Sequence, residues 1–288
     1  MTVRAHAKIN LGLRVLGRRA DGYHDLSTIF HRVDLFDTVR IEPTPDGITM
    51  ECDRADVPTD DGNLCMRAAR MLLAAHPGVG VHIELRKRIP MGAGLGGGSA
   101  DAAAVLRVLP SLLDLRIAEA DLFAMALRLG SDVPFFLRDG SATARGRGEL
   151  LDHFPFACPW WIVLLDPGIH VSTAWAYANL RLAADPDDPD LRALLRRAAD
   201  GDTAALRRLL HNDFEEAVMA THPEIRRARD AMRDAGAVGT LMSGSGASVF
   251  GLFDSDTAAH ACTAAVHPAR ILSVTAPAFI PESVVPVD

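Results

Sequence analysis

The feature that most constrains this 288-residue chain is a glycine-dense turn, PMGAGLGGGS, at residues 90–99. Apolar and polar residues alternate at 81–86 before the turn, and an Ala-rich and Leu-rich segment, 99–113, follows it. These patterns predict a strand, a tight turn and a long helix capped by Ser99 or Asp101. Glycines let a backbone approach a ligand closely, and a helix N-terminus offers unpaired N–H groups and a positive dipole end. The turn is therefore expected to hold phosphate groups, with a flexible linker as the alternative.

Two known nucleotide-binding patterns share these glycines. Gly92, Gly94 and Gly97 fit the dinucleotide pattern G-x-G-x-x-G, but the preceding strand alternates with charges and is not the first element of the chain. Gly98 stands where the P-loop pattern requires lysine. The positive charge that a transferred phosphoryl group needs must then come from magnesium or from another side chain, for which Lys8 is the candidate.

Lysine is rare in this sequence. Lys8 and Lys87 are the two lysines, and removing them from the 30 basic residues leaves 28 arginines. A lysine amine is a compact point charge that fits against a phosphate oxygen where a guanidinium fork is too broad. Lys8 lies in a segment, 3–15, whose odd positions are all apolar, which predicts a half-buried strand with Lys8 and Asn10 on its polar face. That face either lines a cleft or faces solvent, and Lys87 is expected to be solvated.

Three further side chains are candidates for chemistry or binding. Asp132 is the carboxylate best placed to act as a base, because Pro134 stiffens its short loop, GSDVP; a turn-forming role is the alternative. Tyr23 and Tyr177 are the two tyrosines of the chain, and each flanks a loop marked by Gly or Pro. They are either platforms for a nucleobase or core residues.

Composition narrows the function classes. The chain is 49% hydrophobic and 23% charged, which is typical of a globular soluble protein of about two domains. Its net charge of -7, from 37 acidic and 30 basic residues, argues against a general nucleic-acid or membrane-surface binder. The longest apolar stretch, 154–165, contains two prolines and is shorter than the roughly 20 residues of a membrane helix. With no signal-peptide pattern and four scattered cysteines, the expected location is the cytoplasm and the expected thiols are reduced.

The order of predicted elements indicates two domains and an α+β fold. Strands are predicted at 26–33, 38–42, 48–52, 81–86, 141–147, 160–165 and 271–276. Helices are predicted at 63–76, 99–113, 119–129, 172–182, 191–199, 203–210, 223–235 and 257–266. The boundary is placed near residue 155, giving domains at 1–155 and 156–288, with two sheets covered by helices.

Three separated segments resemble the three motifs of the GHMP small-molecule kinases, in the same order and at the same spacing. They are AKINLGL at 7–13, PMGAGLGGGSADAA at 90–103 and LMSGSGASVF at 241–250. Other segments resemble the branch of that family that phosphorylates a cytidine-diphosphate-linked methylerythritol in the non-mevalonate isoprenoid pathway. They are RADGYH at 19–24, DGNL at 61–64, GSDVPFF at 130–136 and DPGIHVST at 166–173.

The resemblance implies a two-domain fold and a reaction. It implies a ribosomal-protein-S5-like α/β N-terminal domain for ATP binding and catalysis, and a ferredoxin-like α+β C-terminal domain for substrate binding. The γ-phosphoryl group of ATP would pass to the 2-hydroxyl of the methylerythritol unit, with Mg²⁺, in a cleft between the domains. The implied partner is this small molecule, without nucleic acid or membrane, and the implied assembly is a monomer or weak homodimer.

The resemblance also implies roles for individual residues. Asp132 would accept the proton of the hydroxyl or orient it, and Lys8 would neutralise developing charge. The implied ATP contacts are Asn63, Pro90, Met91, Gly92, Ala93, Gly94, Leu95, Gly96, Gly97, Gly98, Ser99 and Ala100. The implied substrate contacts are Asn10, Tyr23, His24, Thr173 and Tyr177, with the two tyrosines on either side of the cytosine. No acidic metal ligand is identified, although Ser99 is able to approach the metal, and the loop 244–247 either contacts phosphates or is a structural turn.

Three other functions are weighed against this reading. A GHMP kinase for homoserine or a mevalonate is the first, but a small aliphatic substrate needs no pair of aromatic rings. An RNA-binding protein is the second, because the first domain of the family resembles a ribosomal protein, but the sequence has no basic tract. A dinucleotide-dependent oxidoreductase is the third and rests on the glycines alone.

Overall fold

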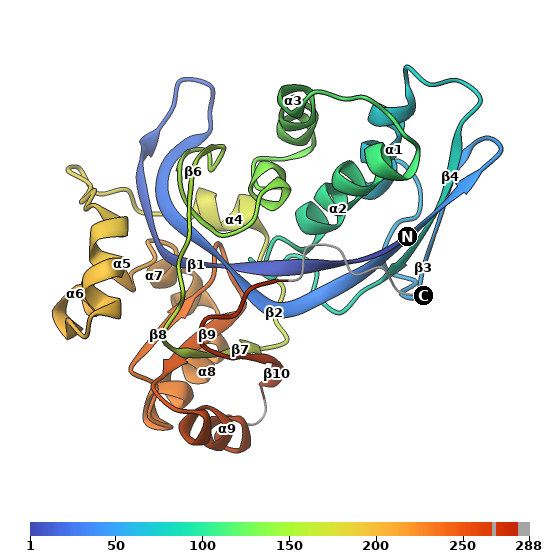
Figure 1. Cartoon of the computed structure of the whole chain (residues 1–288). Helices are drawn as coiled ribbons and strands as arrows, with labels where there is room; N and C mark the ends of the chain where they lie inside the picture. The colour runs from blue at the N-terminus through green and yellow to red at the C-terminus, as the bar shows by residue number, and fades with distance from the viewer. Residues whose placement is uncertain (267–268, 282–288) are drawn as a thin grey trace.

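Two sheets organise the computed structural model, which describes residues 1–266 and 269–281 (Figure 1). In the first sheet the order is β3-β4-β2-β5-β6, and β1 pairs with β2. Its strands are β1 (Thr2–Arg18), β2 (His24–Thr44), β3 (Ile48–Cys52), β4 (Gly80–Arg86), β5 (Ser141–Gly146) and β6 (Leu150–Phe154). In the second sheet the order is β10-β7-β9-β8. Its strands are β7 (Trp161–Asp166), β8 (Gly239–Met242), β9 (Val249–Phe253) and β10 (Arg270–Thr275).

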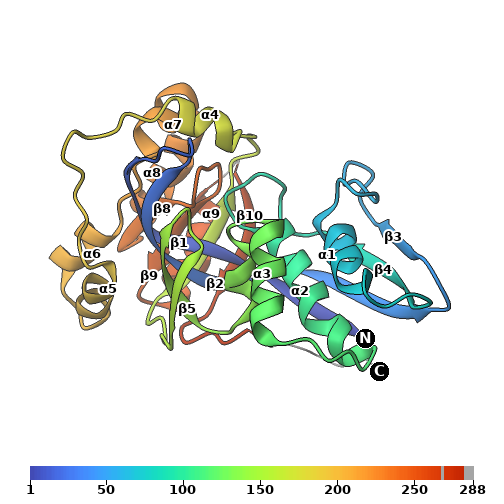
Figure 2. The same cartoon turned by 90° about the horizontal axis from the view of Figure 1, so that it is seen from above.

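Helices cover both sheets. On the first sheet lie α1 (Leu64–Leu73), α2 (Gly97–Leu112) and α3 (Glu119–Leu129), followed by the short 3-10 helix η1 (Val133–Leu137). The second half of the chain contains α4 (Thr173–Ala178), α5 (Leu191–Ala199), α6 (Thr203–Leu209), α7 (Glu215–Thr221), α8 (Pro223–Asp234) and α9 (Asp256–Ala265). Figure 2 shows α5 and α6 at the opposite end of the molecule from α1, β3 and β4.

The second sheet confirms the predicted ferredoxin-like domain. Numbered in chain order, its strands lie in the sequence 4-1-3-2, and every neighbouring pair is antiparallel. Helices α4 to α8 come between the first and second of these strands, and α9 comes between the third and fourth. Together with the mixed first sheet, this arrangement confirms the α+β class.

The hairpin of β1 and β2 crosses both halves of the molecule (Figure 1). The two strands predicted at 26–33 and 38–42 are one strand, β2, of 21 residues. The polar residues Asp34 and Asp37 interrupt the apolar pattern without ending the strand, because no glycine or proline lies between His24 and Glu42. One continuous strand therefore connects the region of α2 with the second half of the chain.

Strand β1 is buried on both faces, so the prediction of a half-buried strand is wrong. The odd positions Ile9 and Leu11 pack with Ile162 and Leu164 of β7 in one apolar core. The even face carries His6, Lys8 and Asn10, which are only 5%, 4% and 2% exposed. These polar side chains do not face bulk solvent, which excludes a solvent-exposed strand face. A face that lines a cleft is the remaining alternative.

Several elements follow the sequence pattern closely and others depart from it. The helices at 119–129 and 191–199 have the predicted bounds. The predicted helix at 172–182 ends at Ala178, and the strands β6, β8 and β9 and the helix α7 were not predicted. The four cysteines are free, as expected. No described helix combines the length and apolar character needed to cross a membrane.

The proposed domain boundary near residue 155 lies between the two sheets. Strand β6 of the first sheet ends at Phe154, and β7 of the second begins at Trp161. Residues 267–268 and 282–288 of the proposed second domain lie outside the described part of the chain. The boundary stays a proposal, since β1 and β2 contribute to the cores of both halves.

A buried histidine of β2 leads to a prediction on stability. His31 Nδ1 lies 2.8 Å from Ser141 Oγ, and burial lowers the pKa of His31 from 6.5 to about 4. Because the unfolded chain takes up this proton first, the neutral buried ring contributes stability above pH 6.5 that is lost as the pH falls toward 4. The difference is about 3 kcal/mol. Urea unfolding of wild type and His31→Asn between pH 7 and 4.5 should show a shallower pH dependence in the variant, and equal slopes would contradict this assignment.

Candidate active site

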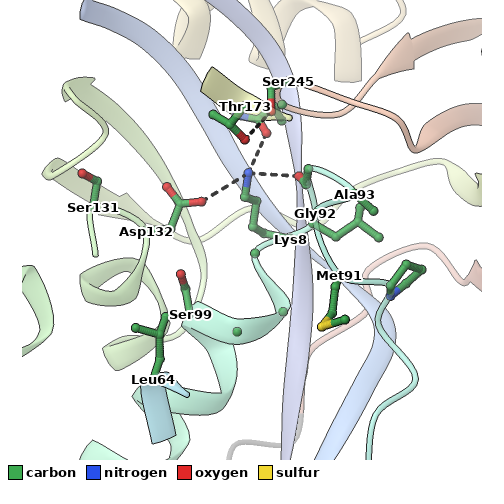
Figure 3. A pocket seen from close by; sticks show the side chains of 18 of the residues that line it. Lys8, Leu64, Met91, Gly92, Ala93, Ser99, Ser131, Asp132, Thr173 and Ser245 are labelled. Carbon is green, nitrogen blue, oxygen red and sulfur yellow. Dashed lines mark hydrogen bonds and ion pairs between the residues drawn. The ribbon is translucent and has the colours of Figure 1, made fainter. Parts of the chain in front are cut away.

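A cleft of about 870 Å³ lies between the two halves and collects most of the predicted site residues. The strands β1 and β2, the glycine loop, the start of α2 and the segment before η1 line it from the first half. Helix α4 and the loop between β8 and β9 line it from the second half. Figure 3 shows the Lys8 amine in the middle of this cleft, with Asp132 on one side and the glycine loop on the other.

The glycine loop begins α2 without a side-chain cap. The N-cap residue is Gly96, in the left-handed region at φ +70°, so the prediction that Ser99 or Asp101 caps this helix is wrong. The N-cap residue lies three positions before Ser99, because glycine adopts this left-handed conformation without strain. The N–H groups of the first turn therefore have neither intrahelical partners nor a capping side chain, and they face a cleft lined by the loop.

The loop of residues 90–96 touches the second half of the chain through its backbone. A Cβ at Gly94 would lie 2.1 Å from the Ser243 carbonyl oxygen, so this position admits only glycine. The Ser243 hydroxyl donates to the Gly94 carbonyl at 3.0 Å, and the Ser248 N–H donates to the Ala93 carbonyl at 3.3 Å. The third motif, at 241–250, thus packs directly against the glycine loop through Ser243 and Ser248.

Lys8 is buried and has several partners. Its Nζ donates to Asn10 Oδ1 at 2.8 Å and to the Gly94 carbonyl at 3.2 Å, and lies 3.5 Å from Asp132 Oδ2. The ring of Phe30 lies 4.9 Å from the same nitrogen. These contacts hold the ammonium group between the glycine loop and the Asp132 carboxylate, which suits it to an anionic reaction centre.

Asp132 is the more accessible partner of this pair. Its side chain is 33% exposed, and it occupies the residue before η1, whose first turn contains Pro134. It is the N-cap residue of η1, but its side chain makes no capping hydrogen bond. The carboxylate is therefore not used by the turn, and it points toward the cleft and Lys8 (Figure 3).

The substrate-side polar residues are held by short hydrogen bonds. Asn10 Nδ2 donates to Thr28 Oγ1 at 2.8 Å, and the Asn10 N–H donates to Ser243 Oγ at 3.3 Å. The hydroxyls of Thr173 and Ser245 lie 3.0 Å apart across the cleft wall (Figure 3). Asn10 and Thr173 are thus fixed before any ligand binds.

An aromatic group forms one end of the cleft. The rings of His24 and Tyr177 stack with centroids 4.8 Å apart, and Phe214 packs edge-on against Tyr177. Burial, with a further contribution from the charge of Asp132, raises the pKa of Tyr177 to about 12. Tyr23 is 55% exposed, and the guanidinium of Arg147 lies 4.6 Å from its ring centre. Burial, with a smaller contribution from the charge of Arg18, lowers the pKa of His24 and so favours the neutral form of the stacked imidazole.

Asn63 lies at the opposite end and caps α1. Its Oδ1 accepts the Cys65 N–H at 2.9 Å, and its Nδ2 donates to the Pro58 carbonyl at 2.8 Å. The side-chain oxygen therefore caps α1, and the amide nitrogen holds the preceding loop at Pro58. A contact with adenine stays a prediction.

Lys87 is buried, so the expectation of a solvated side chain is wrong. Its amine contacts Asp37 and lies 2.8 Å from Asp101 Oδ2, and all three side chains are at most 4% exposed. The alternating strand pattern ends at Arg86, so it gave no sign that position 87 turns inward. Arg147, whose guanidinium lies over the ring of Tyr23, was also missed, because its sequence context, GRGE at 146–149, gives no sign of that contact.

Comparison with known proteins agrees with this geometry. Residues 63–140 match the family model "GHMP kinases N terminal domain", and residues 191–269 match "GHMP kinases C terminal". A 4-diphosphocytidyl-2-C-methyl-D-erythritol kinase of Chlorobium phaeobacteroides is 44% identical over 98% of this chain and 97% of its own length. One from Chlorobium luteolum is 46% identical over 88% of this chain and 89% of its own.

Solved structures show the same likeness. A crystal structure of 4-(cytidine 5'-diphospho)-2C-methyl-D-erythritol kinase is 40% identical, has a TM-score of 0.80, and matches over 96% of this chain and 100% of its own. A homoserine kinase from Cytophaga hutchinsonii, with a TM-score of 0.74 over 99% of this chain and 97% of its own, is 21% identical and shares the fold. With both of its domain models matched and relatives above 40% identity along nearly its whole length, the chain belongs to the GHMP kinase family.

Proposed function

We propose that this chain transfers the γ-phosphoryl group of ATP to the 2-hydroxyl of 4-diphosphocytidyl-2-C-methyl-D-erythritol. The observation that carries the proposal is one continuous cleft with three chemically different parts. A glycine loop lies at a helix N-terminus, a lysine and a carboxylate meet at the centre, and aromatic rings form the far end. Phosphate, reacting hydroxyl and nucleobase each require one of these parts.

The phosphates of ATP are proposed to bind along residues 90–100. Backbone N–H groups of the loop and of the first turn of α2 would donate to the phosphate oxygens, and the positive end of the helix dipole would stabilise their charge. The buried position of Lys8 beside the Gly94 carbonyl brings a full positive charge to the same place. Asn63 is proposed to lie near the adenine, at the end of the cleft formed by α1.

Asp132 and Lys8 are proposed to act on the reacting groups. Asp132 Oδ2 would accept the proton of the 2-hydroxyl as the oxygen bonds to the γ-phosphorus atom, which makes the oxygen a better nucleophile. Lys8 Nζ would donate to the transferred phosphoryl oxygens and neutralise the charge that develops on them. Because the two side chains lie only 3.5 Å apart, a hydroxyl and a phosphoryl group bound beside one of them would also be close to the other.

Magnesium belongs to the same proposal. The cleft lining includes two carboxylates, Asp101 and Asp132, of which Asp101 is already bound by Lys87. Oxygen donors are the ligands that Mg²⁺ prefers, and it usually keeps water and substrate phosphates in its shell. The Ser99 hydroxyl, on the first turn of α2, fits such a site and would hold the ion together with phosphate oxygens. The bound ion would neutralise phosphate charge.

The aromatic end is proposed to bind the cytosine. The ring of Tyr177, fixed by Phe214, would stack on one face of the base and Tyr23 on the other. His24 now covers a face of Tyr177, so a base that takes this place would move the imidazole to the base edge, where it donates or accepts a hydrogen bond. Asn10 and Thr173 would contact the methylerythritol hydroxyls.

The wider assignments form part of the proposal. Residues 1–155 would bind ATP and carry the catalytic pair, and residues 156–288 would complete the substrate site. The cytoplasm and a monomer or weak homodimer are proposed for location and assembly. No nucleic-acid or membrane partner is proposed, since the chain carries a net charge of -7.

The direct test of the function is ADP formation from MgATP with three acceptors compared at equal concentration. We expect turnover with 4-diphosphocytidyl-2-C-methyl-D-erythritol and at least about a thousandfold lower kcat/KM with homoserine or mevalonate, which cannot use the aromatic end. A preference for homoserine or mevalonate would contradict the proposed substrate, and only the membership of the GHMP kinase family would remain valid.

Replacing Asp132 tests the catalytic pair. Asp132→Asn keeps the shape of the side chain but cannot take up the hydroxyl proton, so kcat should fall by on the order of a hundredfold or more with KM values changed less than about threefold. Steady-state kinetics should show no such loss for the matched variant Asp152→Asn, an exposed carboxylate of β6 paired with Arg192. Full turnover by Asp132→Asn would remove this residue as the base.

Replacing Tyr177 tests the base platform. Stacking of a base on an aromatic ring contributes about 1–3 kcal/mol, so Tyr177→Ala should raise KM for the cytidine substrate by about tenfold and leave KM for ATP unchanged. Tyr177→Phe retains the ring and should behave like wild type. An equal loss in both variants would show that the hydroxyl, rather than the ring, is required.

A further inference from the structure

A buried ion triad lies under the glycine loop, outside the groups assigned to the reaction. It consists of Lys87, Asp37 and Asp101, which come from the segment after β4, from β2 and from α2. The relative exposures of these side chains are 4%, 0% and 3%. Lys87 and Asp101 also line the cleft, so the triad forms part of its wall.

The triad joins both ends of the glycine loop. Lys87 lies three positions before the loop of residues 90–96, and Asp101 lies five positions after it. The amine of Lys87 donates to Asp101 Oδ2 at 2.8 Å, which ties the entry of the loop to its exit. Asp37 Oδ1 accepts the N–H of Ile89 at 2.9 Å, which fixes the entry segment to β2 as well.

The packing around the triad is tight on the side of α2. A Cβ at Gly97, the first residue of the helix, would lie 3.2 Å from Lys87 Nζ and 2.8 Å from Ile89 Cγ2. The lysine amine therefore reaches Asp101 by passing directly beneath the start of the helix. Any displacement of the triad would move the N–H groups that face the phosphate site.

Stability alone does not account for these charges. Burying three ionisable side chains costs desolvation free energy, and apolar side chains of similar volume often stabilise a core equally well or better. Lysine is also the rarer choice in a chain with 30 basic residues, of which Lys8 and Lys87 are the lysines, and both line this cleft. In addition, Asp101 Oδ1 is buried and has no hydrogen-bond partner within the described residues.

From this geometry we infer that the ion triad is a positioning device for ATP, which holds the glycine loop and the first turn of α2 in the conformation that binds phosphates. Lys87, Asp37 and Asp101 are positioning residues, since the loop backbone and not the triad would touch the phosphates. The inference rests on the proposed nucleotide site. Loss of the triad is expected to weaken ATP binding and to leave binding of the cytidine substrate unchanged. The reason is that the described contacts of these three side chains do not extend to the aromatic rings of the cleft.

The test uses Asp101→Ala, which separates α2 from the triad and leaves Lys87 paired with Asp37, so no unpaired charge is created. KM for MgATP should rise at least about tenfold, while KM for the methylerythritol substrate stays within about twofold of wild type. Asp101→Asn retains an acceptor for Lys87 and should recover most of the loss. The matched control is Leu109→Ala, on the same helix, fully buried and outside the cleft lining.

Binding of a non-hydrolysable ATP analogue gives a readout that does not need turnover. The analogue should raise the melting temperature of wild type and of Leu109→Ala by similar amounts, and that of Asp101→Ala by much less. Unchanged KM for ATP in Asp101→Ala, or an equal rise of both KM values that Leu109→Ala reproduces, would overturn the inference. If wild type binds the analogue but phosphorylates no cytidine substrate, the proposed function fails while this test still decides the role of the triad.

Discussion

The Lys8 ammonium group lies where β1 passes beneath the glycine loop, and the arrangement of the cleft depends on satisfying that buried charge. A charge out of contact with water is costly unless it is paired and hydrogen-bonded. Asn10, the Gly94 carbonyl and Asp132 supply the partners, and Asn10 is itself fixed by Thr28 of β2. One buried cation therefore sets the relative positions of two strands, a loop and a carboxylate.

Close contact between the two halves is the second constraint. The Gly94 carbonyl can approach Lys8 only because Gly94 lacks a Cβ atom, which would collide with the Ser243 carbonyl oxygen. In return, Ser243 and Ser248 hydrogen-bond the loop backbone. The second sheet thus supports the phosphate-binding loop from behind, and the apolar core shared by β1 and β7 keeps that support rigid. This explains why residues from both halves line one cleft.

The sequence predicts those helices and strands whose ends are set by local residue patterns. Helix α3 has the predicted bounds because its apolar period and its C-terminal Gly130 are local signals. The single long strand β2 was not predictable, because the contacts that carry it through Asp34 and Asp37 come from distant parts of the chain. The Asp34 N–H donates to Thr275, and the Asp37 carboxylate accepts the N–H of Ile89. For the same reason the burial of Lys87 was not visible, because its partners are 50 and 14 residues away in the chain.

The candidate site was predictable mainly through the glycine turn and the family motifs. Lys8, Asp132, Tyr23 and Tyr177 line the same cleft, although they are spread over 170 positions of sequence. Arg147 and Phe214, which support the two tyrosines, lie in segments without a motif of their own. Such supporting contacts depend on tertiary packing and leave no local pattern in the sequence.

The central claim is that one cleft brings a phosphoryl group to a particular hydroxyl of a cytidine-linked substrate. Phosphorus NMR of the reaction mixture with MgATP and 4-diphosphocytidyl-2-C-methyl-D-erythritol tests it most directly. The account predicts one new phosphomonoester signal without vicinal proton coupling, because the carbon that bears the 2-hydroxyl carries a methyl group and no hydrogen. Its amount should equal the ADP formed, with the diphosphate signals retained. Release of inorganic phosphate in place of that signal, or phosphorylation at another hydroxyl, would contradict it.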